Sequence, residues 1–300
     1  MTPCVLCHYP ELEPLFLDLP DREYNVRGLF SFAKCPQCGL VSLEPTPGLK
    51  ELLGYYPPDY HGYHIAQRGL ISSLYRLIYA GRFRLYRELI GTRGRLLDIG
   101  CADAPYADLL KRTLPGMEFT GVEFNEEIAE RGRARGLNII TGTIDDLKAA
   151  EPFDLIIMNN LIEHVTDPVH ELSKAESVLK PSGFIILETP NTDSWDFLLF
   201  GRYWGSLHVP RHLYLFSPKS IRLLADRSGM VEHRFEFLLS TDNWALSTQN
   251  LLQSRSFTKS RIENGRAWYY KYLLLAFVPL CAVQRLFRKT GAFVLILRKR

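Results

Sequence analysis

The most constraining stretch of this chain runs from Arg95 to Glu123, where two apolar segments flank a turn of small residues and a helix-like run. Residues 96–99 predict a buried strand that Gly100 ends in a tight turn. Pro105 marks the first turn of a helix, because proline lacks the N–H group that this turn leaves unpaired. Strand, turn, helix, strand and acid form a nucleotide-cofactor half-site, in which the acid accepts hydrogen bonds from ribose hydroxyls.

The turn reads Gly-Cys-Ala-Asp-Ala from Gly100 to Ala104, and it separates two kinds of cofactor. A dinucleotide site needs bare backbone against a pyrophosphate, and Asp103 would place a negative charge there. S-adenosylmethionine carries no phosphate. The segment resembles the D-x-G-x-G-x-G motif of class I S-adenosylmethionine-dependent methyltransferases: Asp98 and Gly100 match, while Ala102 and Ala104 replace glycines. The alternative is a strand–helix turn that binds nothing.

Apolar segments continue to alternate with helix-like segments beyond this stretch. Such alternation predicts an α/β fold with a doubly wound, mostly parallel sheet, whose ligands lie at the carboxyl ends of the strands. The predicted strands cover residues 96–99, 119–122, 138–141, 153–159, 184–187 and 231–238.

Four of the six cysteines form two C-x-x-C pairs near the N-terminus, Cys4 with Cys7 and Cys35 with Cys38. The start of the sequence lacks the charged and apolar regions of a signal peptide, so we expect a reducing cytoplasm, where paired cysteines indicate metal ligands. Four thiolates complete the tetrahedral shell of Zn²⁺ and leave no open position. We therefore expect a structural zinc in a small ribbon-like segment over residues 1–45.

Later motifs make the resemblance more specific. The stretches Glu163-His164-Val-x-Asp-Pro, Leu179-Lys-Pro-x-Gly, Glu188-x-Pro-Asn and Pro210-Arg-His212-Leu-x-Leu-Phe-Ser are similar to consecutive motifs of one group of these methyltransferases. In that group two C-x-x-C pairs precede the cofactor domain, and members occur in polysaccharide and deoxysugar pathways. The resemblance implies a seven-stranded Rossmann-like sheet, with an antiparallel last strand over residues 292–297. It also implies a sugar, nucleotide sugar or lipid-linked saccharide as acceptor.

The same resemblance implies roles for individual residues around S-adenosylmethionine. Glu123 would hold the ribose hydroxyls, and Asn160 would contact cofactor or substrate from the end of a strand. A methyl acceptor gains from a base that titrates near pH 7, and His212 is the first candidate, with His164 as the second. The other expected cofactor contacts lie in the turn and in the adenine-binding segment: Asp98, Gly100, Ala102, Ile144 and Asp145.

The remaining segments suggest the domain organisation. We expect a linker and a basic amphipathic helix over residues 46–92, then the methyltransferase domain over 93–300 with a helical insertion at about 242–288. The helix-like run Trp268–Phe287 is apolar and flanked by basic residues, and its longest uncharged part, Tyr272 to Val283, is too short to span a bilayer. It suits either buried core or a peripheral contact with the inner face of the membrane.

Two other functions fit parts of the sequence. A zinc-ribbon RNA methyltransferase would need clustered basic residues near the N-terminus, yet residues 1–40 hold five acids against three Lys and Arg. Nucleic acid is therefore not the expected partner. A non-catalytic interaction protein is the second alternative, because Ala102, Ala104 and Thr143 depart from the cofactor motifs. The net charge of +3 favours neither.

Overall fold

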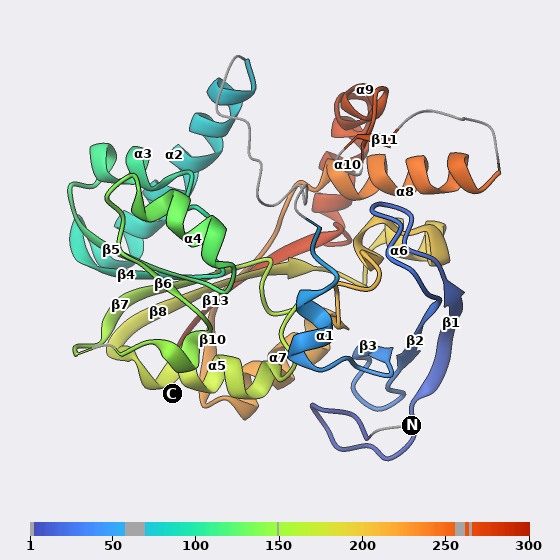
Figure 1. Cartoon of the computed structure of the whole chain (residues 1–300), viewed down its shortest axis with the longest axis horizontal. Helices are drawn as coiled ribbons and strands as arrows, with labels where there is room; N and C mark the ends of the chain where they lie inside the picture. Colours follow the sequence, from blue (N-terminus) through green and yellow to red (C-terminus); the bar gives the residue numbers. More distant parts are fainter. Residues whose placement is uncertain (1–2, 58–69, 149, 256–261, 264–265) are drawn as a thin grey trace.

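The computed structural model describes residues 3–57, 70–148, 150–255, 262–263 and 266–300. A seven-stranded sheet forms its centre, in the order β10-β13-β8-β7-β4-β5-β6 (Figure 1). Strands β4 to β8 pair in parallel, whereas β13 is antiparallel to both β8 and β10. The predicted fold class is confirmed. The strands are β4 (Arg93–Ile99), β5 (Gly116–Glu123), β6 (Ile139–Thr141), β7 (Phe153–Asn159), β8 (Leu179–Pro190), β10 (Met230–Phe237) and β13 (Ala292–Lys299).

Helices cover both faces of this sheet, which explains why its central strands are apolar without alternation. Leu155 and Ile157 of β7 face one side, where they pack in a cluster with Phe83 and Leu110. Their neighbour Ile156 faces the other side. Figure 1 shows the first three of these helices over one face and the last two over the other: α2 (Leu70–Ile90), α3 (Ala107–Thr113), α4 (Glu126–Arg133), α5 (Pro168–Ser177) and α7 (Pro218–Arg227).

A second sheet of four strands, in the order β1-β2-β3-β9, carries the N-terminal segment. Its last strand comes from the distant part of the chain that follows His212, so residues 1–45 share a sheet with the methyltransferase domain. Phe32 and Leu43 belong to the same hydrophobic cluster as Ile156. The elements are β1 (Glu13–Leu19), β2 (Phe30–Lys34), β3 (Val41–Glu44), β9 (Tyr214–Leu215) and the short helix α1 (Leu49–Leu53).

The insertion between β10 and β13 is helical. Its apolar part is broken near Phe277 into two helices, with Pro279 in the first turn of the second. Among the described residues, no helix combines the length and the apolar character needed to cross a bilayer. The insertion contains α8 (Thr241–Ser254), β11 (Ile262–Glu263), β12 (Arg266–Ala267), α9 (Tyr270–Ala276) and α10 (Val278–Leu286). The loop before β9 adds α6 (Trp195–Phe200) and the 3-10 turns η3 (Gly201–Tyr203) and η4 (Gly205–Leu207); another 3-10 turn, η2 (Ile144–Asp146), follows β6.

Candidate functional site

A cavity of about 470 Å³ lies at the carboxyl ends of β4, β5, β7 and β8, where a doubly wound sheet binds its ligands. Its volume falls within the usual range of small-molecule sites. Cofactor-turn residues line one part of it and histidines another. The lining residues used below are Tyr56, Tyr79, Arg82, Asp98, Gly100, Ala102, Tyr106, Glu123, Phe124, Asn160, Glu163, His164, Glu188, Ser206, His208, His212, Leu239 and Arg266.

The turn after β4 has a left-handed backbone at Gly100, Ala102 and Ala104, with φ of 73°, 49° and 48°. The buried carboxylate of Glu123 holds this turn, since its Oε2 accepts from the Ala102 N–H at 3.0 Å. Its Oε1 accepts from the Asn125 N–H at 2.9 Å. Burial raises the pKa of Glu123, while these N–H groups oppose that shift. The predicted acid therefore lies at the cavity and fixes the turn beside it.

Asp98 also lies at the cavity, where the Tyr106 hydroxyl donates to its Oδ2 at 2.7 Å. Burial raises the pKa of Asp98 to about 7. Tyr79 stacks on Tyr106 with ring centroids 4.9 Å apart, so aromatic rings form the wall next to this carboxyl. Sequence reasoning missed both tyrosines, because nothing in their spacing distinguishes them from core aromatics.

The structure does not bring all the predicted cofactor contacts together. Asn160 lines the cavity at the end of β7, in a left-handed conformation with φ of 48°. Ile144 is buried in the core of the domain. Asp145 is exposed and pairs with His170 at 3.0 Å and with Lys174 at 3.2 Å. Neither Ile144 nor Asp145 is among the residues that line the cavity.

The two predicted histidines meet in this cavity, with ring centroids 4.5 Å apart. The Nδ1 of His164 lies 3.0 Å from the Arg211 carbonyl oxygen, and that of His212 lies 2.8 Å from the Ser206 carbonyl. A carbonyl oxygen can only accept, so both Nδ1 atoms carry the hydrogen and both Nε2 atoms keep a lone pair. Burial lowers the pKa of His164 to about 4 and holds that of His212 well below its usual range, so both rings are neutral at pH 7 and, contrary to the sequence prediction, neither titrates near pH 7.

Glu163 joins the two histidines and was not predicted as a site residue. Its side chain is fully buried, and its Oε2 accepts from the Thr189 hydroxyl at 2.9 Å. Its Oε1 has no hydrogen-bond partner in the part of the chain that the structure describes. Burial raises the pKa of Glu163 to about 8. One oxygen of Glu163 and one nitrogen from each of His164 and His212 lie within 4.8 Å of one another, a spacing that suits the ligands of a metal ion.

The N-terminal segment holds the loop that carries His212. The Arg211 guanidinium is fully buried and donates to both oxygens of Asp21, at 2.9 and 3.0 Å. The Nδ1 of His208 lies 2.6 Å from an oxygen of Glu23, which also pairs with Arg266 at 3.0 Å. These contacts connect the N-terminal segment to the wall of the cavity, although Asp21 and Arg211 are 190 positions apart in the sequence.

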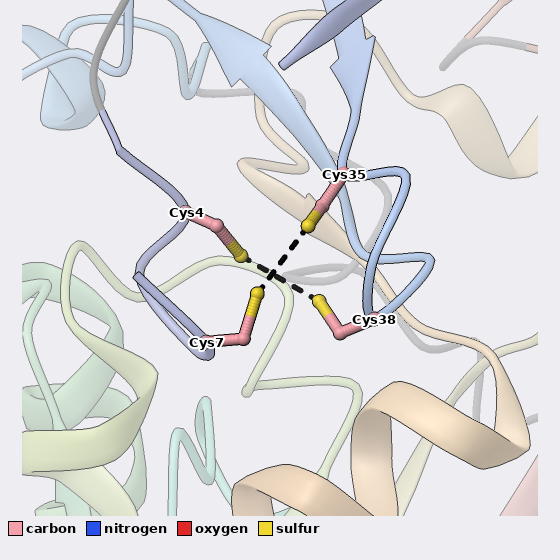
Figure 2. Close-up of side chains that lie close together, drawn as sticks. All are labelled: Cys4, Cys7, Cys35 and Cys38. Atoms are coloured by element: carbon pink, nitrogen blue, oxygen red, sulfur yellow. Dashed lines mark hydrogen bonds between the residues drawn. The ribbon is translucent and has the colours of Figure 1, made fainter. Parts of the chain in front are cut away.

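The four predicted metal ligands converge on one point (Figure 2). The Sγ atoms of Cys4 and Cys38 lie 3.5 Å apart, and those of Cys7 and Cys35 lie 3.4 Å apart. All four sulfurs lie within 4.8 Å of one another. Zn–S bonds of about 2.3 Å in a tetrahedron place sulfurs about 3.8 Å apart. The cluster therefore fits one Zn²⁺, and the four thiolates leave no position for a substrate.

Comparisons with known proteins agree with this geometry. A protein-family model described as "Methyltransferase domain" matches residues 74–231. The ubiquinone biosynthesis O-methyltransferase of Cereibacter sphaeroides (strain ATCC 17029) is 30% identical over 178 residues, which cover 52% of this chain and 69% of that protein. The enzyme of the same description from Bradyrhizobium sp. is 26% identical over 175 residues, which cover 51% of this chain and 66% of that protein.

Two solved structures share the fold at low sequence identity. A putative sarcosine dimethylglycine methyltransferase from Galdieria sulphuraria is 17% identical, covers 83% of this chain and 96% of its own, and has a TM-score of 0.53. The O-methyltransferase of a trans-AT PKS multienzyme from Brevibacillus brevis, solved with S-adenosyl-L-homocysteine, is 12% identical. It covers 76% of this chain and 75% of its own, with a TM-score of 0.50.

Proposed function

The chain belongs to the methyltransferase domain family and is an S-adenosylmethionine-dependent methyltransferase, and we propose that it methylates a hydroxyl oxygen of a small acceptor. One observation carries the proposal: the carboxylate that holds the cofactor turn and two neutral histidines line the same cavity. The names of the relatives support oxygen as the atom methylated. The family membership and the names of the relatives favour an enzyme over the non-catalytic alternative.

The residues of the turn fit the cofactor. Glu123 would hold the ribose hydroxyls, because a carboxylate oxygen that accepts one N–H keeps room for a second donor. Gly100, Ala102 and Asp98 would surround the methionine end, and Phe124, the residue after Glu123, also lines the cavity. Once bound, S-adenosylmethionine supplies an activated methyl group that needs only an aligned nucleophile.

The histidines supply the proton acceptor for the hydroxyl. The Nε2 lone pair of His212 is the first candidate and that of His164 the second, since both rings are held by carbonyl oxygens at Nδ1. The nearby Glu163 carboxyl, whose pKa burial raises to about 8, is protonated at pH 7 and adds no negative charge beside the rings. Tyr56, whose hydroxyl lies 2.9 Å from the Nδ1 of His164, orients that ring.

The acceptor class is the open part of the proposal. The sequence motifs favour a saccharide, whereas the relatives named above are described by ubiquinone biosynthesis. A hydroxylated ring with a lipid tail and a lipid-linked saccharide are both amphiphiles, so both suit a cavity with polar residues and an apolar rim at Leu239. An RNA acceptor finds no support among the proteins compared.

Binding of S-adenosylmethionine by calorimetry, followed by a screen for methyl transfer, tests the proposal. The native chain should bind the cofactor and methylate one class among hydroxylated prenyl-phenols, nucleotide sugars and lipid-linked saccharides. His212→Gln should keep the cofactor affinity and lose the transfer. Transfer to a nitrogen-only acceptor, or full activity of the double variant with His164→Gln, would refute the assignment of oxygen and of the base.

The four cysteines fit a structural Zn²⁺, and we propose that this ion stabilises residues 1–45. Its role would be to hold Cys4 and Cys7 against Cys35 and Cys38, because β1 to β3 form a small sheet. A metal analysis of the purified protein should find one zinc per chain. A zinc content that persists after all four cysteines are replaced would refute the assignment.

A further inference from the structure

The outward face of the α9–α10 pair is apolar, whereas its packed face is partly polar. On α10, Cys281 and Gln284 are fully buried, and the Gln284 Oε1 accepts from the Trp244 indole N–H at 2.8 Å. Leu286 lies on the opposite side of the helix and is 82% exposed. An ordinary surface helix turns its apolar side chains toward the core and its polar side chains toward water, whereas α10 buries the polar Gln284 and exposes Leu286.

Aromatic and aliphatic side chains extend this face over α9. Leu275 is 74% exposed and Trp268 is 69% exposed. In Figure 1, α9 and α10 lie next to α8, on the side of the molecule opposite to α5 and α7. We define the insertion face as the exposed apolar residues of this region: Trp268, Tyr272, Leu275, Val278, Val283, Leu286 and Phe287. A monomeric soluble protein rarely leaves such a set in water, and tryptophan and tyrosine prefer membrane interfaces.

The exposed charges on α9 and α10 themselves all have one sign. No acidic residue follows Glu263 in the sequence, whereas Lys271, Arg285 and Arg288 are exposed around the apolar residues. An acid from another element, Asp193, lies 2.5 Å from Lys289 and neutralises that lysine alone. Basic residues that flank an apolar helical face match an anionic lipid surface.

The packed side of α10 lies next to the rim of the cavity. The Sγ of Cys281 on α10 approaches the Ser240 carbonyl oxygen at 3.5 Å. The neighbouring Leu239 lines the cavity and is half exposed, so it forms part of the rim. The helix that carries part of the insertion face therefore packs, by its opposite side, on the segment that forms this rim.

We propose that the insertion face docks on a membrane leaflet that contains anionic phospholipid. The apolar residues enter the boundary between headgroups and acyl chains, and Lys271 and Arg285 bind the headgroup phosphates. The proposal concerns a surface outside the cavity and does not depend on the acceptor class. A short helical pair of this kind lies on a membrane and does not span it.

Sedimentation of the full chain with lipid vesicles tests the proposal. Binding should be strong to phosphatidylcholine vesicles that contain phosphatidylglycerol, weak to pure phosphatidylcholine, and reduced by salt. Leu275→Glu and Leu286→Glu should each weaken binding by about tenfold or more, because each removes a leucine from the apolar contact. Lys271→Gln combined with Arg285→Gln should cost about thirtyfold on anionic vesicles only.

Leu29→Glu is the matched control, since Leu29 is a comparably exposed leucine in the N-terminal segment. It should bind vesicles like the native chain. Calorimetry with S-adenosylmethionine checks that every variant is folded, and its result bears on the cofactor site alone. Unchanged vesicle binding in the Leu275 and Leu286 variants would overturn the proposal. So would a native dimer without vesicles that these variants convert to a monomer, because the face would then cover a second copy.

Discussion

Replacement of Asp21 by asparagine tests how the N-terminal segment supports the loop that carries Arg211 and His212. Asp21 accepts two hydrogen bonds from Arg211 and further ones from the backbone N–H groups of Glu23, Tyr24 and Val26. Both charged side chains are almost completely buried. Asparagine keeps the shape of the side chain but leaves the guanidinium without a counter-charge.

The expected loss of stability follows from that burial. Removal of one partner of a buried ion pair costs about 3–5 kcal/mol, because the other charge stays buried. For the Asn variant we expect a loss of stability of about 3 kcal/mol, at the low end of this range. Its amide oxygen still accepts one hydrogen bond, and Arg211 also donates to the Val209 carbonyl. With a urea dependence of about 3 kcal/mol per M, the unfolding midpoint should fall by about 1 M.

Urea unfolding followed by circular dichroism measures this loss against a surface control. Glu127 pairs with Arg131 at 2.8 Å on the exposed side of α4, and Glu127→Gln should cost less than about 1 kcal/mol. The Asp21 variant should still bind S-adenosylmethionine, because Glu123 and its turn belong to the other sheet. Methyl transfer should fall, because the carbonyl oxygen of Arg211 positions His164. A loss below about 1 kcal/mol with full transfer would refute this reasoning.

Further predictions concern the cofactor, the base and the metal. Glu123→Gln should weaken S-adenosylmethionine binding about tenfold or more in calorimetry, since hydrogen bonds to a charged group are worth about 1.5–3 kcal/mol; unchanged affinity would count against its role. His212→Gln should lower kcat about 10²- to 10⁴-fold with unchanged cofactor affinity, measured by transfer of a labelled methyl group. Removal of zinc by a chelator should lower the melting temperature of the native chain, whereas a Cys38→Ala variant should gain nothing from added zinc.

Much of the fold could be predicted from the sequence, because strands that are buried on both faces of a sheet are apolar throughout. The run from Leu155 to Met158 is apolar throughout, which only a covered strand or a core helix tolerates, and its length indicates a strand. The C-x-x-C pairs likewise fix a tetrahedral cluster by local geometry. The helix of residues 241–254 lies within the helical insertion expected at about 242–288, but the sequence did not mark its bounds, because its polar residues Asn243, Ser247 and Asn250 are buried against the loop before β9.

The site was less accessible from the sequence, because several of its contacts join distant residues. The ion pair of Arg211 with Asp21 joins residues 190 positions apart. Thr189 binds one oxygen of the Glu163 carboxyl, and the other oxygen has no hydrogen-bond partner among the described residues; only the folded structure reveals either fact. The expected adenine contact at Asp145 depended on position in a motif. In the structure, Asp146 takes part in a capping box with Thr143, and its neighbour Asp145 points instead to α5.

The cofactor turn shows why a departure from a glycine pattern need not abolish the site. A left-handed alanine costs about 1–2 kcal/mol relative to glycine, so glycine at these positions serves the backbone first. Here Ala104 is fully buried in a small cluster with Cys101 and Ala129, and its methyl group gains packing that offsets this cost. Ala102 lines the cavity and lacks that packing, but its N–H is held by Glu123. The acid therefore fixes the turn and also lines the cavity, and of the two alanines only Ala102 is among the lining residues.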